Sequence, residues 1–297
     1  MNIIESHIVS ENQLPVRLLD FCISNFKYIN TRAGIKKAIK KNIIKLDEED
    51  ARGGEWLKSG QKIDVYESEN SSHKEFPLKL EIIFEDDDIA IINKPAGFEV
   101  SGNKYKTIQN ALAFNLKTSS RKDFLSRPVP VHRLDYPTSG LLVCAKTHQS
   151  VVNLSKQFQE KTIKKTYLAI VNGKLEDSGI IDEELDGKKS ITLYESLKII
   201  PSIKSNYVSL IKLKPETGRT HQIRRHLSHI GHPIVGDANY NLDLPLLKGK
   251  GLFLSATEIA FIHPNTNNNV EFKLNIPHKF SSLMERELRR FKKFEKR

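Results

Sequence analysis

The stretch that organises this chain reads Val131-His132-Arg133-Leu134-Asp135-Tyr136-Pro137-Thr138-Ser139-Gly140-Leu141-Leu142-Val143. Pro128 and Pro130 keep the approach to it extended, because proline fixes its own φ and biases the preceding residue toward β. The polar segment after Asp135 predicts a loop, and the apolar run 141–145 is typical of a buried strand. We therefore expect Asp135 on a tight loop between two extended segments, close to Arg133, where a rigid sheet usually presents chemical groups.

Asp135 has two interpretations of about equal weight on physical grounds alone, a turn-capping residue or a chemical group. A resemblance favours the second. The pattern His-Arg-Leu-Asp-x-x-Thr-Ser-Gly, followed by an apolar strand and Ala145-Lys146-Thr147, resembles the signature of the RluA-type pseudouridine synthases. The resemblance implies that Asp135 is the catalytic residue, that His132 and Arg133 contact RNA, and that Arg133 helps to fill the place of an extruded base.

The composition indicates a soluble protein with an anionic partner. The 297 residues, 38% hydrophobic and 28% charged, allow one large domain or two. The formal net charge is +11, which favours a polyanion such as RNA, because basic side chains displace counterions condensed on phosphates. An acidic membrane surface is the weaker alternative, since the sequence has no lipidation motif and no apolar run near the ~18 residues that span a bilayer.

The termini and the cysteines suit a cytoplasmic protein. The N-terminus lacks the basic start and apolar core of a signal peptide, and Cys22 and Cys144 lie far apart and offer no disulfide framework. A reducing cytoplasm fits both observations, and we expect a monomer. Residues 280–297 predict a helix whose basic surplus suits RNA contact or serves only solubility.

Residues 15–67 are expected to form a small separate module, preceded by a tail or a leading strand over 1–14. Apolar residues recur at helical spacing over 18–26 and again over 32–41. The basic residues of the second helix are Arg32, Lys36, Lys37, Lys40 and Lys41. Most basic helix faces are only solvated. However, the order helix, basic helix, strand, Leu-x-x-Gly-x-x-Ile strand resembles the small RNA-binding module named after ribosomal protein S-four, which implies that this face contacts RNA.

Residues 68–79 are polar and patternless, which predicts a linker. A hairpin follows over 80–93, because residues alternate on both arms around the acidic turn 85–88. The aspartates of the turn raise the alternative of a metal site, but a surface turn is the expected role. The acidic turn leading to Asn-Lys-Pro-Ala-Gly at 93–97 resembles the first motif of the same family.

Tyr167 lies on a predicted strand that ends in a turn at Gly173, after an amphipathic helix over 151–158 that Thr147 could cap. An aromatic residue in such a strand is by default a core or edge residue. However, the arrangement Lys165-x-Tyr167 before a strand resembles a family motif whose tyrosine stacks on the target base. The resemblance therefore implies that role for Tyr167.

The third pattern begins Gly218-Arg219-Thr220-His221-Gln222-Ile223-Arg224 and predicts a helix that stops at Gly231. Its histidines raise the possibility of a metal site, but His221 and His226 are five apart and no cysteine lies near, so we expect no metal. The pattern, continuing through Asp237, resembles the family's other long motif. That resemblance implies that Arg224 pairs with Asp135 and that Arg219 and His221 contact RNA.

The resemblance covers about residues 80–265 and implies an α+β catalytic domain over 80–297. Its fold would be a mixed, largely antiparallel sheet flanked by helices, with the cleft across the sheet. The implied reaction breaks the bond from ribose to uracil nitrogen one, rotates the base and rejoins it at carbon five. No redox change or net water is involved, so no cofactor is expected. Asp135 would act as nucleophile or general base on a flipped uridine of rRNA or tRNA, held ionised by Arg224.

Two other classes of function compete with this prediction. The basic surplus and the N-terminal module also suit a non-catalytic RNA-binding or ribosome-assembly protein. Asp135, Tyr167 and Arg224 together favour the enzyme, because a pure binder has no need of a carboxylate facing phosphates. A retaining glycosidase needs two paired carboxylates, and no second candidate stands out. We therefore expect an RNA pseudouridine synthase.

Overall fold

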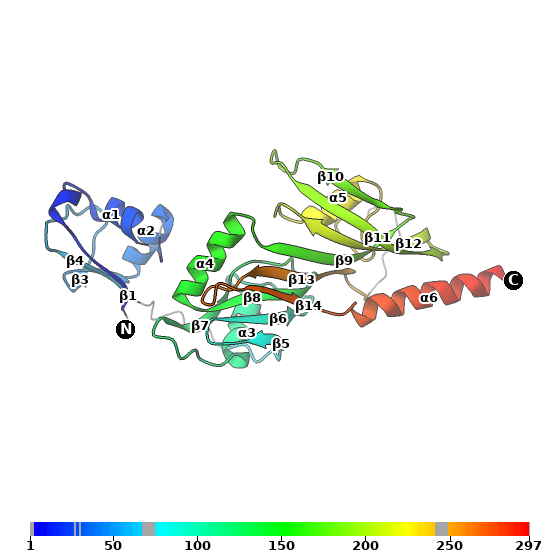
Figure 1. Ribbon diagram of the computed structural model, residues 1–297, viewed down its shortest axis with the longest axis horizontal. Helices are drawn as coiled ribbons and strands as arrows, with labels where there is room; N and C mark the ends of the chain where they lie inside the picture. Colours follow the sequence, from blue (N-terminus) through cyan, green and yellow to red (C-terminus); the bar gives the residue numbers. More distant parts are fainter. Residues whose placement is uncertain (1–2, 27, 30, 67–74, 241–248, 297) are drawn as a thin grey trace. The chain divides into compact units, whose positions relative to one another are not determined.

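The computed structural model of the chain describes residues 3–26, 28–29, 31–66, 75–240 and 249–296. They divide into two compact units, Met1–Lys74 with Lys122–Leu125 and Glu75–Arg121 with Ser126–Arg297 (Figure 1). Most of the linker expected over 68–79 lies outside the described residues. Its last part is not a linker, because Phe76 and Leu78 pack against the buried core of the second unit. No helix of the described chain is long and apolar enough to cross a membrane.

The first unit packs two short helices on a four-stranded sheet of order β1-β4-β2-β3. Its core is formed by the apolar stripes of both helices and the inner strand residues, among them Phe21, Ile35 and Ile63. The elements are β1 (Ile3–Ile8), α1 (Leu18–Asn25), α2 (Arg32–Lys40), β2 (Ile44–Leu46), β3 (Glu49–Asp50) and β4 (Lys62–Tyr66), with a single 3-10 turn at Glu11–Gln13.

Residues 1–14, expected as a tail or a leading strand, provide a leading strand. Strand β1 pairs antiparallel with β4, and Val9 is buried in the core of the unit. Little in the local pattern indicates this strand, because all of its side chains are exposed or half-buried and it is held mainly by its ladder of backbone hydrogen bonds.

Among the described residues, the second unit is built on a ten-stranded sheet (Figure 1). Its elements are β5 (Glu81–Glu85), β6 (Ile89–Lys94), α3 (Ile108–Asn115), β7 (Phe124–Pro130), β8 (Ser139–Thr147), α4 (His148–Gln159), β9 (Lys164–Asn172), β10 (Ser178–Asp182), β11 (Ile191–Ser202), β12 (Asn206–Pro215), α5 (Gln222–His229), β13 (Leu254–Ile262), β14 (Asn269–Lys273) and α6 (His278–Glu295). The strand order is β10-β11-β12-β9-β13-β8-β6-β5. Helix α4 packs on β8, α5 on β11 and β12, and α6 on β11.

The expected mixed, largely antiparallel sheet with flanking helices is confirmed. Along the strand order, β8 and β13 are parallel and the other neighbours antiparallel. The parallel contact requires a glycine. Gly140 has φ +116°, and a Cβ there would lie 2.1 Å from the carbonyl oxygen of Ala256. The Ser-Gly of the central motif thus lets β8 meet β13 directly after the loop that carries Asp135.

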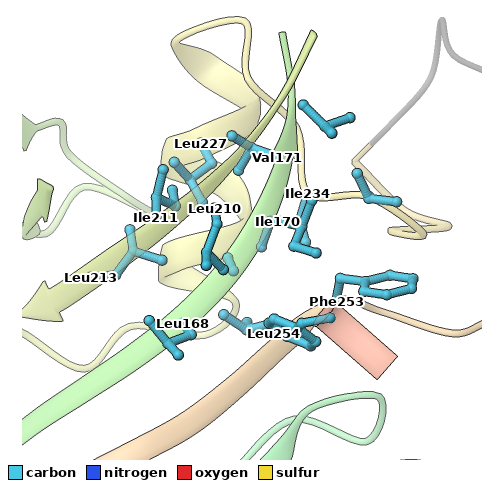
Figure 2. Packing of buried hydrophobic residues seen from close by; sticks show 14 of the residues in the cluster. Leu168, Ile170, Val171, Leu210, Ile211, Leu213, Leu227, Ile234, Phe253 and Leu254 are labelled. Atoms are coloured by element: carbon cyan, nitrogen blue, oxygen red, sulfur yellow. The ribbon is translucent and has the colours of Figure 1, made fainter. Parts of the chain in front are cut away.

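The largest hydrophobic cluster lies where α5 and α6 cover the strands on the β9–β12 side of the sheet. Figure 2 shows Val171 of β9 and Ile211 of β12, which lie on the same face of the sheet, beside Leu227 of α5. The helical stripe that the sequence predicted around Ile223 and Leu227 is therefore the buried face of α5. This packing fixes α5 in position and thereby places Arg224, on the same helix, beside Asp135 of the central motif.

Candidate active site

A cleft of about 900 Å³ lies in the second unit, where the three sequence motifs meet. Asp135 comes from the β7–β8 loop, Tyr167 from β9 and Arg224 from α5, and all three line the cleft. A volume of this size is within the range of sites that take a small-molecule-sized group. His132, Arg133, Arg219 and His221 are also part of its lining.

Asp135 sits at a tight turn, as the sequence predicted. The backbone N–H of Thr138 donates to the carbonyl oxygen of Asp135 over 3.0 Å. Before the turn, Leu134 is buried in the core beside α3, which anchors the backbone. The Asp135 side chain is 28% exposed toward the cleft, so the carboxylate is reachable while its backbone is fixed.

Lys94, the last residue of β6, holds this loop from inside the protein. Its side chain is fully buried, and Nζ donates to the carbonyl oxygens of Thr138 at 2.7 Å and Pro95 at 3.0 Å. The carbonyl oxygens of Asp135 and Tyr136 lie 3.4 Å away. Burial lowers the pKa of Lys94 to about 8, an effect that the negative charge of Asp135 partly opposes.

The role of Lys94 was not predicted from the sequence, because Asn-Lys-Pro-Ala-Gly was interpreted as the end of a hairpin and as part of a family motif, with no role given to the lysine. A signal was present, because the lysine follows the apolar run 89–92 after a single residue. A lysine at the end of a buried strand has to place its ammonium group against oxygen acceptors.

Arg224 is buried and stands between two carboxylates. Its Nη1 lies 3.6 Å from Oδ2 of Asp135, whereas Nε and Nη2 donate to the two oxygens of Asp237 at 2.7 and 2.8 Å. Burial acts to lower the pKa of Arg224, but the hydrogen bonds and charge of Asp237 and the charge of Asp135 outweigh it and raise that pKa. Arg224 thus forms an ion pair with each carboxylate, and the expected pair with Asp135 is the longer of the two.

Asp237 is the second residue that the sequence analysis did not assign to the site. Burial acts to raise its pKa, but the hydrogen bonds from Arg224 and from the backbone N–H groups of Asn239 and Tyr240 lower the pKa overall. The side chain is fully enclosed. A bidentate arginine–carboxylate pair of this kind fixes the plane of the guanidinium group, so Asp237 fixes the direction in which Arg224 presents Nη1 to Asp135.

Tyr167 faces the cleft from β9 and is half-buried. Burial raises the pKa of its hydroxyl, and the nearby negative charge of Asp135 adds to that effect. The phenol is therefore neutral at physiological pH. Its ring also packs against two of the hydrophobic clusters, so Tyr167 contacts the core and lines the cleft, and its stacking on a target base stays a prediction.

His221 approaches Asp135 from the start of α5. Its Nε2 lies 3.9 Å from Oδ1 of Asp135, and its backbone has a left-handed φ of 54°. His221 was predicted to contact RNA, and the structure also places it beside the Asp135 carboxylate. Its Nδ1 lies 2.9 Å from the hydroxyl oxygen of Tyr240.

The remaining predicted residues of the cleft differ in their exposure and in their hydrogen bonds to the protein. Arg133 is exposed. Arg219 is half-buried, and its guanidinium group donates to the carbonyl oxygen of Lys189. His132 accepts the backbone N–H of Val143 at Nε2 over 3.0 Å and stacks on Phe158. Burial, with a smaller effect from Lys165, lowers the pKa of His132 to about 3, so this ring is neutral and supports β8.

The basic residues predicted on the second helix of the N-terminal module lie on α2 of the first unit or, for Lys41, at its C-terminal cap, outside the lining of the cleft. All are exposed: Arg32, Lys36, Lys37, Lys40 and Lys41. Arg32 forms a long ion pair of 3.5 Å with Asp20. The side chain of Thr31 accepts the backbone N–H of Gly34 and caps the helix, so the basic face is held on a well-defined element.

Among the described residues, Asp86, Asp88 and His263 have the spacing of a possible metal cluster, but their ligand atoms have protein partners. His263 accepts backbone N–H groups at Nδ1, so Nε2 carries the proton and donates to Asp86 over 2.9 Å. Asp88 pairs with Arg121. Of the histidines in the third motif, His226 is bound at both ring nitrogens by protein oxygens. These contacts explain the side chains without a metal.

Comparison with known proteins gives one consistent family. Residues 88–229 match the family described as RNA pseudouridylate synthase. Ribosomal large subunit pseudouridine synthase D of Nitrosomonas europaea is 33% identical over 86% of this chain and 80% of its own length. tRNA pseudouridine synthase C of Vibrio parahaemolyticus is 32% identical over 71% and 96%. The structure of human RNA pseudouridylate synthase domain containing 1 superposes with a TM-score of 0.53 at 27% identity, covering 70% of this chain and 86% of that one.

Proposed function

The chain belongs to the RNA pseudouridylate synthase family, as an RNA pseudouridine synthase, and from this premise we propose that its cleft isomerises uridines of ribosomal or transfer RNA around Asp135. One observation carries the proposal: three residues from motifs far apart in the sequence line the same cleft, namely Asp135, Tyr167 and Arg224. Relatives that match most of this chain are named for large-subunit ribosomal RNA and for transfer RNA, which supports both as the substrate class.

The target uridine enters the cleft only after leaving its stack in folded RNA, at a cost of a few kcal/mol. Tyr167 offsets part of that cost with its ring, since stacking on an aromatic side chain contributes about 1–3 kcal/mol per base. Arg133, exposed at the cleft, occupies the place that the base leaves in the RNA. These roles leave Asp135 free to act on the sugar or the base.

Asp135 acts as an ionised carboxylate, as nucleophile or as general base, and both roles require the same surroundings. Arg224 supplies a positive charge 3.6 Å from it, and the bidentate bond to Asp237 prevents Arg224 from closing on Asp135 and covering both of its oxygens. The neutral Tyr167 hydroxyl lines the same cleft without adding a charge.

The wider surface serves RNA binding. A formal net charge of +11 and the exposed basic face of α2 favour contact with the phosphate backbone, and the N-terminal unit acts as an RNA-binding module. The reaction rearranges atoms already present in uridine, so the enzyme works without a cofactor. It acts as a monomer on RNA in the cytoplasm, without a membrane partner.

The test of this function is Asp135→Asn, which is nearly isosteric but cannot act as base or nucleophile. We expect pseudouridine formation by the purified variant to be abolished, with RNA affinity within a few fold of wild type. Asp182→Asn is the matched control, because Asp182 is an exposed carboxylate of β10 that does not line the cleft. Substantial turnover by Asp135→Asn would exclude Asp135 as the catalytic group.

The substrate is identified by mapping pseudouridine in total RNA from a deletion strain and its parent. We expect specific positions in ribosomal or transfer RNA to lose the modification, and purified protein to restore it. An unchanged map, together with no activity of the purified protein on that RNA, would contradict the proposed function and favour the non-catalytic RNA-binding protein.

A further inference from the structure

Tyr240 lies outside the cleft but touches both residues that flank the catalytic carboxylate. Its hydroxyl oxygen is 2.9 Å from Nδ1 of His221, and the guanidinium carbon of Arg224 lies 5.0 Å from the centre of its ring. Among the described residues, His221 and Arg224 are the two basic side chains within 4 Å of the Asp135 carboxylate. We propose that Tyr240 is a positioning residue of the active site, holding His221 and Arg224 in place around Asp135.

Tyr240 is itself held firmly at several points. Its backbone N–H donates to Oδ1 of Asp237 over 3.2 Å, and its carbonyl oxygen accepts the hydroxyl of Ser228, on α5, over 2.7 Å. The same Asp237 binds Arg224. Because one carboxylate anchors both the arginine and the tyrosine backbone beneath it, the ring stays under the guanidinium group.

The hydroxyl of Tyr240 also supports one tautomer of His221. Of the two ring nitrogens, Nε2 faces the Asp135 carboxylate at 3.9 Å, and a carboxylate favours an N–H over a lone pair. A neutral His221 therefore carries its proton on Nε2, so Nδ1 accepts and the Tyr240 hydroxyl donates. A partner on one ring nitrogen fixes which nitrogen carries the proton and how the ring is oriented.

His221 needs such support because its backbone provides little of its own. The residue has φ 54° and ψ 25°, and no side-chain hydrogen bond caps α5 at this position. Left-handed backbone is uncommon for residues other than glycine. The hydrogen bond to Tyr240 and the edge-on ring contact, with centroids 5.7 Å apart, fix the imidazole where its Nε2 proton can close on Asp135 when RNA binds, as catalytic hydrogen bonds often do.

The inference rests on the proposed function for its kinetic test, which compares Tyr240→Phe and Tyr240→Leu with wild type. Tyr240→Phe keeps the ring and removes the bond to His221, so we expect the single-turnover rate at saturating RNA to fall roughly fivefold, with RNA affinity unchanged. Tyr240→Leu also removes the face beneath Arg224 and should lower the rate by roughly a further threefold. Tyr207→Phe is the matched control, because Tyr207 is exposed on β12 and does not line the cleft.

A double-mutant cycle separates positioning from a general structural role. In a His221→Ala background the hydroxyl of Tyr240 has no partner, so Tyr240→Phe should have no further effect on the rate. An equal loss of rate in both backgrounds would overturn the proposal. So would a Tyr240→Phe rate within twofold of wild type.

A spectroscopic test is independent of activity and so of the proposed function. In ¹⁵N-histidine spectra of the full chain, with His221→Asn used for assignment, the neutral ring of His221 should carry its proton on Nε2 in the wild type. Tyr240→Phe should convert it to a mixture of tautomers, while melting temperature stays the same. A ring protonated on Nδ1 in the wild type, or a spectrum unaffected by Tyr240→Phe, contradicts the proposal even if the enzyme is active.

Discussion

The bond between Arg224 and Asp237 gives a sharp test of how the Asp135 carboxylate is supported, because the same helix carries a matched exposed pair. Asp237→Asn keeps the shape of the side chain but removes its charge. Arg224 is 3% exposed and Asp237 is fully enclosed, so the variant leaves a buried cation without its main partner. Arg225, the next residue of α5, makes an equally bidentate bond to Asp186 at 2.9 and 3.1 Å, but Asp186 is 69% exposed.

The expected loss of folding free energy differs widely between the variants of these two pairs. Breaking a buried pair by removing one partner typically costs about 3–5 kcal/mol of folding free energy, and we expect the lower end for Asp237→Asn, because Asp135 remains 3.6 Å from Arg224 as a second counter-charge. Asp186→Asn should cost less than about 1 kcal/mol, since water screens an exposed pair. Urea unfolding of both variants measures the difference directly.

Catalysis should fall together with stability in Asp237→Asn. Without Asp237 the guanidinium group turns toward Asp135, and a displacement of about 1 Å near reacting groups can cost roughly 100-fold in rate. We expect a loss of that order in the single-turnover rate for Asp237→Asn and a wild-type rate for Asp186→Asn. If the two variants lose equal stability, or if Asp237→Asn reacts at the wild-type rate, then Asp237 does not hold Arg224 in its working position.

The pH dependence of stability gives the same test a second readout. The pKa of Asp237 is lowered in the folded protein, so the folded state binds this proton less readily than the unfolded chain does. The stabilisation is therefore complete above the unfolded pKa of about 3.9 and is lost as the pH falls through the folded pKa. Asp237→Asn should therefore reduce the loss of folding free energy at low pH. Asp186→Asn removes only an exposed pair and should leave most of that pH dependence unchanged.

Two further predictions concern RNA. If the basic face of α2 contacts phosphates, replacing its four lysines with alanine should weaken binding and reduce the salt slope by roughly 0.7–0.9 per lost contact, leaving the rate at saturating RNA unchanged; an unchanged slope would mean a solvated surface. The lysines are Lys36, Lys37, Lys40 and Lys41. If Tyr167 stacks on the flipped base, Tyr167→Leu should lose much more single-turnover rate than Tyr167→Phe, with both folded by thermal melting. Equal losses would instead implicate the hydroxyl in proton transfer.

Elements with a strong local pattern could be predicted from the sequence. Helix α2 begins at Arg32, where the predicted helical spacing begins, and is capped by Thr31. Helix α5 ends just before Gly231, whose φ of 78° suits a helix stop. Helix α3 was missed, and so was β14, an edge strand of exposed and half-buried residues that depends on pairing with β13. Such elements are stabilised by neighbours far away in the chain, which a local pattern does not contain.

The residues of the candidate site likewise divide into those that the sequence could predict and those that it could not. Asp135, Tyr167 and Arg224 were predicted, but only because their motifs resemble a known family; composition and spacing alone left each with a plain structural alternative. The roles of Lys94 and Asp237 at the site were not predicted, although both residues lie in motifs that were recognised in the sequence. Their roles depend on partners brought close by the fold: Lys94 binds a carbonyl 44 positions along the chain.

The charges around Asp135 explain why two buried partners are needed. Lys94 and Arg224 bring two positive charges close to the loop, Asp237 neutralises one of them through a bidentate bond, and Asp135 is left to balance the other. On the proposed function, RNA closes the cleft and removes water, and a carboxylate without a counter-charge is costly there. Lys94 opposes that cost, and because its ammonium group is bonded to neutral carbonyl oxygens, it does so without occupying the carboxylate oxygens. Asp237 restrains Arg224 from covering them. The oxygens of the carboxylate are then open to the sugar or the base, as the proposal requires.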